Sequence, residues 1–500
     1  MAAVDLEVAA VAVTKPESAK DFSVSQSRQH NSLQKSSLQK SSLQKSSLQK
    51  NALQQNAHQK SSLQTNPNLK GLLASAGCAL LAGLPNHVQA AELSDWDFDV
   101  ATLVYVESDS RVNALEPVIS ATRNFDSETK LNLKLVVDAL TGASPNGATP
   151  SDQPQTFARP SGSGEFITAA GDQPLDDTFR DTRVAMSATY SAPINRDWAY
   201  SAGGYLSKEY DYLSLGVNGS LSRYLNQKNT TLTIGGNFSL DSLNPEGNVP
   251  IGLSSVAVPG TPSFDADFAS SRGTDSEDKT IADLLLGVTQ VINRRTLMQF
   301  NYSISTSDGY LTDPFKIVSV IDDAAGINFG GNFQQSGHNL YLYEMRPDSR
   351  VKQSLYWQTK YQRENSDIVD VSYRFMFDDW GINSHTLDLK YRWQLGQHYL
   401  EPQLRWYSQS AADFYQPYLT ASSYPEVQAA DKKLSADYRL GDLDTYTLGL
   451  KYGYRLASGN EAYARGALYQ QKSTGNDGFG KLARQDLYPD TTAVMFTAGY

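Results

Sequence analysis

The sequence predicts an all-β protein, a closed antiparallel transmembrane β-barrel of about 16 strands, with long external loops and short periplasmic turns. First, segments of roughly ten residues alternate apolar and polar side chains, as a strand does when only one face meets lipid. Second, short turn-forming connections alternate with long ones. Third, the mean hydropathy is -0.44, and no run reaches the ~18 apolar residues that a membrane-spanning helix needs.

Residues 1–69 are expected to form a disordered, low-complexity N-terminal extension. Residues 32–50 read SLQKSSLQKSSLQKSSLQK, which is a five-residue repeat. Such a period matches neither the ~3.6-residue nor the ~3.5-residue period of helices, so no steady apolar stripe results.

Residues 70–90 are predicted to be a secretory signal peptide. Lys70 supplies positive charge, residues 71–84 are mostly apolar, and the small residues Val88 and Ala90 precede a cleavage site before Ala91. The alternative is a lipoprotein acylated on Cys78, but the apolar run continues well past that residue. The barrel itself is then expected over residues 91–500.

Charge and cysteine content exclude several classes of protein. The net charge is -11, with +5 on residues 1–90 and therefore -16 on the rest. Nucleic-acid binding needs clustered positive charge, so it is not expected. The single cysteine, Cys78, permits no internal disulfide, zinc knuckle or thiol-redox motif.

Sixteen candidate strands follow the predicted signal peptide, and an even number leaves both ends of the barrel in the periplasm. Residues 434–456 are too long for one plain crossing, and we interpret them as one strand that extends above the membrane. The predicted strands are residues 98–107, 113–124, 130–140, 182–192, 198–206, 212–224, 230–240, 280–292, 296–306, 349–362, 368–378, 384–395, 398–408, 434–456, 460–471 and 491–500.

The alternation within these segments predicts which face meets lipid. In residues 384–395, Leu387, Leu389 and Trp393 share a face, and Asp388 and Lys390 share the other. A soluble β-sandwich also alternates, but it seldom sustains ten-residue strands sixteen times. We therefore expect the apolar face to meet lipid, the charged face to meet water inside the barrel, and the sheet to close, because an open edge in lipid leaves backbone groups unpaired.

Aromatic residues near predicted strand ends are typical of interfacial girdles. The chain ends TTAVMFTAGY, which resembles the C-terminal signal read by the outer-membrane barrel assembly machinery. Outer-membrane lipid and lipopolysaccharide are then the expected surroundings. The predicted girdle residues are Trp96, Trp198, Tyr205, Trp357, Trp380, Trp406 and Tyr407.

Six segments together resemble one family of uncharacterised bacterial outer-membrane β-barrel proteins. The resemblance implies a signal-bearing barrel in the cell outer membrane, and gene neighbours that encode small lipoproteins, thioredoxin-like proteins and a flavin-transferring enzyme. It supplies no catalytic residues. The segments are LVVDALTGASPNGA (135–148), DGYLTDPFK (308–316), YEMRPDSR (343–350), DDWGINSHT (378–386), RWYSQSAADFY (405–415) and SADYRLG (435–441).

The sequence does not predict an enzyme, a cofactor or a bound metal. It lacks the phosphate-binding, zinc-protease and nucleophile-elbow motifs. After residue 90 the histidines are His338, His385 and His398, and a rim position explains His385 more simply than a catalytic one. Asp265 and Asp267 begin like a calcium loop, but Phe268 and Ala269 occupy the places of the next ligand and glycine, which favours a solvated loop.

Charged residues in the second half of the chain are the candidate lumen and rim residues. A salt-bridged rim that fixes loops against the barrel mouth is the simpler interpretation of the loop residues, and a charged, solute-selecting constriction is the alternative. The candidates are Glu344, Arg346, Asp348, Arg350, Lys352, Lys360, Arg374, Asp378, Asp379, His385, Asp388, Lys390, Arg392 and Arg405.

The inward faces of the later strands are predicted to carry more Lys and Arg than Asp and Glu. Besides the inward-facing residues among the candidates above, these faces are expected to carry Lys451, Arg455, Asp370 and Glu401. Sixteen strands enclose room for water. We therefore expect a pore for small polar solutes, which favours anions if the lumen is open. Charges that pair across the lumen, or a long loop folded inward, would instead close it. The alternative hypotheses are a scaffold that docks a lipoprotein or redox assembly and, third, an outer-membrane enzyme.

Overall fold

The computed structural model describes residues 95–108, 111–321, 339–430, 432–457, 459–473 and 490–500. The expected extension (1–69), the signal peptide (70–90) with Cys78, and His338 lie outside the described residues. No helix among the described residues is long and apolar enough to cross a membrane.

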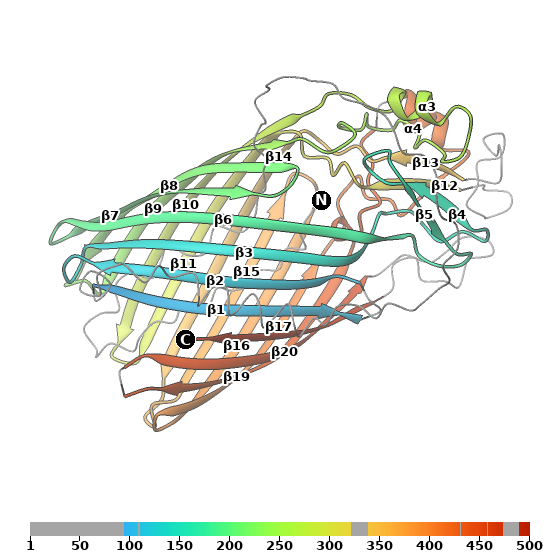
Figure 1. Ribbon diagram of the computed structural model, residues 1–500. Helices are drawn as coiled ribbons and strands as arrows, with labels where there is room; N and C mark the ends of the chain where they lie inside the picture. The colour runs from blue at the N-terminus through green and yellow to red at the C-terminus, as the bar shows by residue number, and fades with distance from the viewer. Residues whose placement is uncertain (1–94, 109–110, 322–338, 431, 458, 474–489) are drawn as a thin grey trace, which may run out of the picture. The chain divides into compact units, whose positions relative to one another are not determined.

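The main structure is a closed antiparallel barrel of sixteen strands, which confirms the predicted fold class (Figure 1). The first and last strands close it, with Ala101 opposite Gly499 and Glu107 opposite Ala493. Around the ring the strands are β1 (Trp96–Glu107), β2 (Asn113–Asn124), β3 (Lys130–Pro145), β6 (Leu175–Asn195), β7 (Trp198–Lys208), β8 (Tyr212–Leu225), β9 (Thr230–Leu243), β10 (Glu277–Asn293), β11 (Thr296–Gly309), β14 (Ser349–Gln362), β15 (Ile368–Asp378), β16 (Asn383–Leu395), β17 (His398–Gln409), β19 (Leu443–Arg455), β20 (Glu461–Ser473) and β21 (Thr491–Gly499).

The apolar face of each strand points outward and the polar face points into the barrel. In β19, Leu448 and Leu450 are more than half exposed, whereas Thr447 and Lys451 on either side of them are buried. Because a water-soluble protein would bury the leucines, an apolar exposed belt on a closed barrel places the chain in the outer membrane.

The two rims of the barrel differ, as predicted. One rim, the turn rim, carries short turns such as Gly396-Gln397 between β16 and β17. The other, the loop rim, carries long loops whose described residues, 146–174, 244–276, 310–321, 339–348, 410–430 and 432–442, form the small elements at one end of the barrel (Figure 1). In outer-membrane barrels the longer loops face outside the cell.

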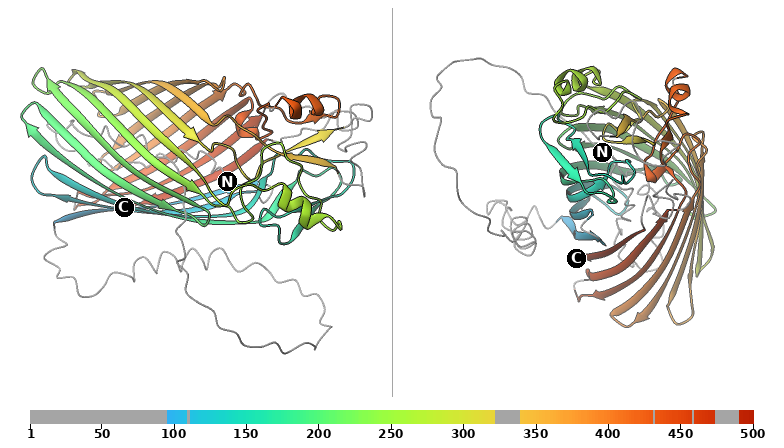
Figure 2. Two further views of the ribbon diagram at one scale, coloured as in Figure 1. Left: turned by 90° about the horizontal axis from the view of Figure 1, so that it is seen from above. Right: turned by 90° about the vertical axis from the view of Figure 1, so that its right-hand side faces the viewer.

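The four long loops fold together into what we call the cap. Their elements are the hairpin β4 (Gln155–Ala158) and β5 (Glu165–Thr168), the helices α3 (Phe264–Ser270), α4 (Tyr424–Ala429) and η3 (Tyr438–Leu440), and the strands β12 (Ile317–Ile321), β13 (Leu340–Tyr343) and β18 (Leu419–Thr420). The three strands form a sheet in the order β13-β12-β18. Seen from the loop rim, this sheet lies in front of the barrel interior (Figure 2, right).

Strand β12 is the centre of the cap because both of its faces are buried. Val318 and Val320 pack in one apolar cluster with residues of three loops. Ile317 packs on the other side with Phe157 and Tyr341. The cap therefore has its own hydrophobic core outside the membrane.

The loops joined in the cap leave the barrel at separated points of the ring. Loop 146–174 follows the third strand of the ring, and loop 310–348 follows the ninth. Yet the backbone N–H of Ile317 donates to the Asn146 carbonyl at 2.8 Å, and Leu434 and Met345 form a β-bridge. The cap thus ties together points of the rim that are six strands apart.

Two sequence-based interpretations were wrong. Residues 434–456 are not one strand: β19 begins at Leu443, and residues 434–440 belong to the cap. Of the predicted girdle residues, Trp380 is buried in a cap cluster with Phe414, Tyr205 lies over Gly216 on the inward face, and Tyr407 is inward beside Thr445. Aromatic content near a strand end does not distinguish these positions from a girdle.

Candidate functional site

The inward face of β14–β17, β19 and β20, here called the cationic wall, carries charged side chains in successive hydrogen-bonded rows. Glu401, Lys451 and Arg465 share one row with Arg392. The next row holds Lys360, Asp370 and Lys390, the next Asp388 and Arg405, and the next Arg374. Neighbouring rows are about 7 Å apart, so Lys or Arg recurs at each such step over four consecutive rows.

Many of these charges are paired along the wall. Arg392 Nε lies 2.6 Å from Glu401 Oε2, Lys390 Nζ 3.5 Å from Asp388, and Lys360 Nζ 3.5 Å from Asp370. The Lys360, Lys390 and Arg392 side chains nevertheless remain 48%, 33% and 23% exposed. These cations therefore face water inside the barrel rather than lipid.

Cations exceed anions on this wall by two to one among the residues of its six strands. Register and alternation place the predicted Arg350 on the same face, together with Arg465, which the sequence did not single out. The ten cations are Arg350, Lys352, Lys360, Arg374, Lys390, Arg392, Arg405, Lys451, Arg455 and Arg465, and the five anions are Asp370, Asp378, Asp388, Glu401 and Glu461.

Aromatic rings lie flat against the wall near the turn rim. Tyr399 is fully buried over Gly453, where an added Cβ would lie 2.2 Å from its ring. The Arg392 guanidinium lies 4.0 Å from the Tyr399 ring centre, and Lys451 Nζ lies 3.9 Å from that of Tyr463. Such cation–π contacts hold the long cations against the wall.

At the loop rim, the candidate residues are held by an ion pair between β14 and β15 and by hydrogen bonds from backbone N–H groups. Arg350 forms an ion pair with Asp378, and its guanidinium lies 4.3 Å from the Trp380 ring centre. Asp379 Oδ1 accepts from the Val351 N–H at 2.9 Å, and the Asp348 carbonyl accepts from Gly309 N–H at 2.8 Å. Lys352 lies opposite Asp378 in the β14–β15 register.

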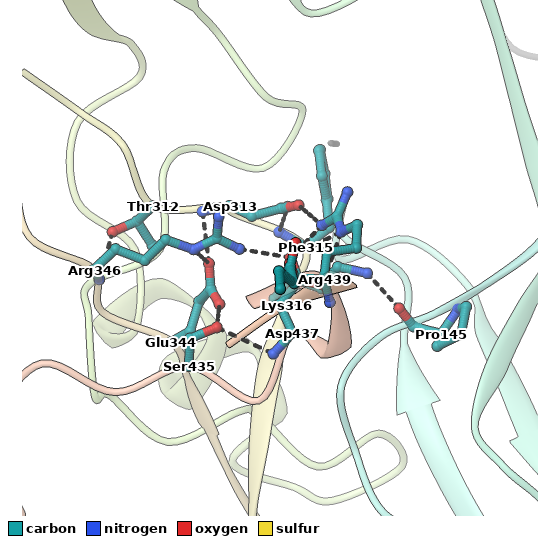
Figure 3. Close-up of polar contacts among 11 residues, drawn as sticks. Pro145, Thr312, Asp313, Phe315, Lys316, Glu344, Arg346, Ser435, Asp437 and Arg439 are labelled. Carbon is teal, nitrogen blue, oxygen red and sulfur yellow. Dashed lines mark hydrogen bonds and ion pairs between the residues drawn. The ribbon is translucent and has the colours of Figure 1, made fainter. Parts of the chain in front are cut away.

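Glu344 and Arg346, two further candidates, lie in a buried ionic network inside the cap (Figure 3). Arg346 Nε lies 2.6 Å from Glu344 Oε1, and its Nη2 lies 2.8 Å from Asp437 Oδ2. Arg439 pairs with Asp437 and, at 3.0 Å, with Asp313 Oδ2. The sequence did not single out Asp313, Asp437 or Arg439, although all three stand in segments that carried the family resemblance.

The network is balanced in charge and also makes hydrogen bonds with backbone groups. Lys316 is its third cation, and its Nζ donates to the Pro145 carbonyl. Asp313 N–H donates to Glu344 Oε1 at 2.8 Å, and the Asp437 N–H donates to Ser435 Oγ at 3.1 Å. Three carboxylates and three cations from two loops, with a carbonyl from the end of β3, therefore form one connected set.

The acids in the network differ in pKa. Burial alone raises the pKa of Asp437, but Arg439, Lys316 and Arg346 more than offset this and hold that pKa below its usual range. Burial raises the pKa of Glu344, and Arg346 opposes this only in part. Asp437 is thus the firmly ionised partner of the cations, and Glu344 is the carboxyl that accepts a proton first.

All six segments that carried the family resemblance meet at this end of the molecule. Segment 135–148 supplies Pro145 and Asn146, 308–316 and 343–350 supply network residues, and 435–441 supplies Asp437. Segments 378–386 and 405–415 meet where Asp413 N–H donates to the Trp380 carbonyl at 2.8 Å. A family model described as a protein of unknown function, DUF3570, matches residues 70–500.

The chain belongs to the DUF3570 family.

Comparison of this DUF3570 barrel with solved structures gives weak likenesses to bacterial barrels. CdiB from Acinetobacter baumannii is 8% identical, with 81% of this chain and 60% of that chain covered and a TM-score of 0.38. OccK9 (OpdG) of Pseudomonas aeruginosa is 8% identical, with coverages of 82% and 98% and a TM-score of 0.36. A P. aeruginosa FadL homologue is 13% identical, with coverages of 81% and 90% and a TM-score of 0.36.

Sequence identities and TM-scores this low carry no functional information. The chain also spans only 60% of the A. baumannii siderophore receptor PirA, as it does of CdiB. No curated protein matches the DUF3570 chain.

His385 lies on the outward face of the DUF3570 barrel. It is opposite Phe375 in the register and stacks on Trp406 with ring centres 6.4 Å apart. Its Nδ1 shares a hydrogen bond with the Tyr373 hydroxyl at 2.7 Å. His385 therefore belongs to an aromatic band near the loop rim, away from the lumen charges.

An apolar hollow of about 1080 Å³ also lies on the outward face of this DUF3570 barrel. Its lining includes Ile234, Leu286 and Phe300, which are exposed outward residues of β9, β10 and β11. Because these strands meet lipid there, the hollow lies in the hydrocarbon region and is not a site for a polar solute.

Asp265 and Asp267 lie in the first turn of α3, a seven-residue helix in the cap of this DUF3570 protein. Within the described ranges, no group of three or more His, Cys, Asp or Glu side chains is arranged to hold a metal ion.

Proposed function

We propose that this outer-membrane barrel is a passive channel for small polar solutes, preferentially anions. The observation that carries the proposal is the cationic wall, where Lys or Arg recurs over four consecutive rows and cations outnumber anions two to one. A wall of one dominant charge raises the local concentration of ions of the opposite charge beside it. The spacing of about 7 Å gives an anion a next cation within reach at each step.

Planar-bilayer recordings of the purified protein test this proposal. Under a KCl gradient, the reversal potential should show that chloride is more permeant than potassium. Replacing Arg374, Lys390 and Arg405 together by Glu should bring the chloride-to-potassium permeability ratio below one, because the wall then becomes net acidic. The matched control Lys432→Glu changes an exposed cap lysine and should leave the ratio unchanged.

Two results count against the channel. Wild-type protein that inserts into bilayers without any ion current excludes an open pathway. A cation-selective wild type contradicts the role given to the cationic wall.

The second candidate function is a scaffold that docks a lipoprotein or a redox partner at the cell surface. The observation that favours it is exposed apolar side chains on the cap and rim: Ile167 is 69% exposed and Ile251 47%. A partner that co-purifies with the wild type, but not with the Ile167→Asp, Ile251→Asp variant, supports docking. We propose no catalytic role, and His385→Ala is expected to leave the folded protein's function intact.

A further inference from the structure

The wall made by the inward faces of β7–β11, here called the hydroxyl wall, differs from the cationic wall in composition. Its inward side chains are mostly Ser, Thr, Asn and Gly, and its charged residues are Asp241, Glu277, Lys279 and Asp283. The hydroxyl and amide residues are Ser201, Ser207, Ser214, Asn218, Ser220, Ser222, Thr231, Thr233, Asn237, Ser239, Thr289, Gln299, Asn301, Ser303, Ser305 and Ser307.

These polar residues form rows that cross several strands. Ser201 faces Ser220 across β7 and β8, and their hydroxyls lie 2.7 Å apart. Ser222 and Thr233 pair across β8 and β9 at 3.0 Å. On β11, Asn301, Ser303 and Ser305 continue along one inward line and are partly exposed. Ser207, Ser214, Thr233, Ser239 and Ser307 are buried, so the wall offers donors and acceptors to a solute at the partly exposed residues between them.

The two walls adjoin where β11 pairs with β14, and three strands of the first, β7, β8 and β9, lie half a ring from β17, β19 and β20 of the second. The hydroxyl wall occupies the fifth to ninth positions of the closed ring, and the cationic wall the tenth to fifteenth. A path between the two walls is lined on the first mostly by short side chains, together with Tyr205, Tyr212 and Tyr224, and on the second by long Arg, Lys and Tyr side chains. A solute in that path has hydroxyl and amide groups on one side and the ends of cationic side chains on the other.

We infer that the preferred solutes are polyhydroxylated anions, such as sugar acids or sugar phosphates. An anionic group pairs with the cationic wall, as the proposed channel function already requires, and this inference rests on that function. The hydroxyl groups exchange hydrogen bonds to water for hydrogen bonds to the opposite wall. An anion with the same number of carbon atoms but no hydroxyl groups pairs with the cationic wall and forms no hydrogen bonds with the hydroxyl wall.

Reversal potentials with two six-carbon anions test the inference. Gluconate carries five hydroxyl groups and hexanesulfonate none, and both remain ionised at neutral pH. Gluconate should be the more permeant anion, although it is the bulkier and more strongly hydrated one. In the Asn218→Ala, Ser303→Ala, Ser305→Ala variant, its permeability relative to hexanesulfonate should fall about threefold or more, as expected for losing one or two net hydrogen bonds.

The control variant Thr306→Ala removes an outward hydroxyl of the same strand and should leave both permeabilities unchanged. Hexanesulfonate passing as well as gluconate, in a channel that still prefers chloride over potassium, overturns the inference and leaves the channel proposal intact. A triple variant that inserts normally and keeps the wild-type gluconate preference also overturns it. Absence of current in the wild type instead overturns the channel function itself.

Discussion

Asp437 is the residue on which the three cations of the buried network, Lys316, Arg346 and Arg439, converge. Its side chain is 1% exposed, and it binds Arg346 and Arg439 directly. A buried ion pair contributes little net stability over an apolar pair, but removal of one partner leaves a buried charge that nothing compensates. The network therefore makes the cap depend on each of its members.

Asp437→Asn should unfold the cap while the barrel persists. The change leaves three buried cations with two carboxylates, at a cost of about 3–5 kcal/mol. Hydrogen-exchange mass spectrometry should show lost protection in residues 313–317 and 434–440. The control Glu426→Gln breaks the exposed pair with Lys432, which contributes only about 0–1 kcal/mol, and protection should be kept. Equal protection in both variants would contradict the role of the network.

The same residues predict how the cap responds to acid. Asp437, with its lowered pKa, contributes stability that is complete above its unfolded pKa of ~3.9 and is lost as the pH falls through the lower folded value. Glu344, with its raised pKa, acts in the opposite sense, because its ionisation opposes folding at neutral pH. Exchange protection of the cap, corrected for intrinsic rates, should hold from pH 7 to about 5 and fall only below about pH 4. Loss of protection already at pH 6 would contradict this assignment.

Gly453 is required on the inward face because Tyr399 covers it. Gly453→Ala places a Cβ 2.2 Å from the ring and should cost about 1–3 kcal/mol. Gly466→Ala in the neighbouring strand is the matched control, since its Cβ meets no atom within 4 Å. Urea unfolding followed by tryptophan fluorescence measures the stability change of each variant. A stability loss that is the same in the two variants would show that the ring contact does not matter.

At the level of the strand, the two faces of each barrel strand have different surroundings. In β15, Val371 lies on the outward face opposite Leu389, and Ser372 lies on the inward face opposite Asp388. Neighbouring residues of one strand therefore meet hydrocarbon and water respectively.

Val371→Arg and Ser372→Arg should differ sharply although they add the same side chain to adjacent residues. The first places a charge in hydrocarbon and should cost about 2–4 kcal/mol, whereas the second adds a cation to the lumen beside Asp388. Unfolding midpoints in lipid vesicles report the difference. Equal destabilisation of the two variants would contradict the assignment of the faces.

The whole molecule depends on closure between β1 and β21. Thr102 and Ala498 are register partners on the outward face of this seam. In a Cys78→Ser background, Thr102→Cys with Ala498→Cys should form a disulfide on oxidation, visible as a changed mobility without reductant. Thr102→Cys with Thr497→Cys places the thiols on opposite faces and should not crosslink. Failure of the first pair to crosslink in the folded protein would contradict the closed ring.

The barrel could be predicted from the sequence because its strands alternate. Only one face of each strand is apolar, so a two-residue period marks the strand and its orientation together. The wall cations, among them Arg374, Lys390 and Arg405, follow directly from that period. The same rule also assigns His385 to the outward face, since it shares a parity with Leu387 and Leu389.

The cap could not be predicted in the same way because its strands are buried on both sides. IVSVI (317–321) and LYLY (340–343) have no alternation, and they stand inside a loop. A short, continuous apolar run is the signal that could have revealed them. The ionic network joins residues up to 126 positions apart, as between Asp313 and Arg439, and no local pattern encodes such a pairing.

Because each cap loop is held by the others, the folded surface that the cap presents to the outside of the cell depends on several loops together. Free peptides copied from residues 310–321 or 410–430 lack the neighbours that order them. Antibodies raised against such peptides should fail to recognise intact cells, whereas antibodies raised against the whole folded protein should recognise epitopes assembled from several loops.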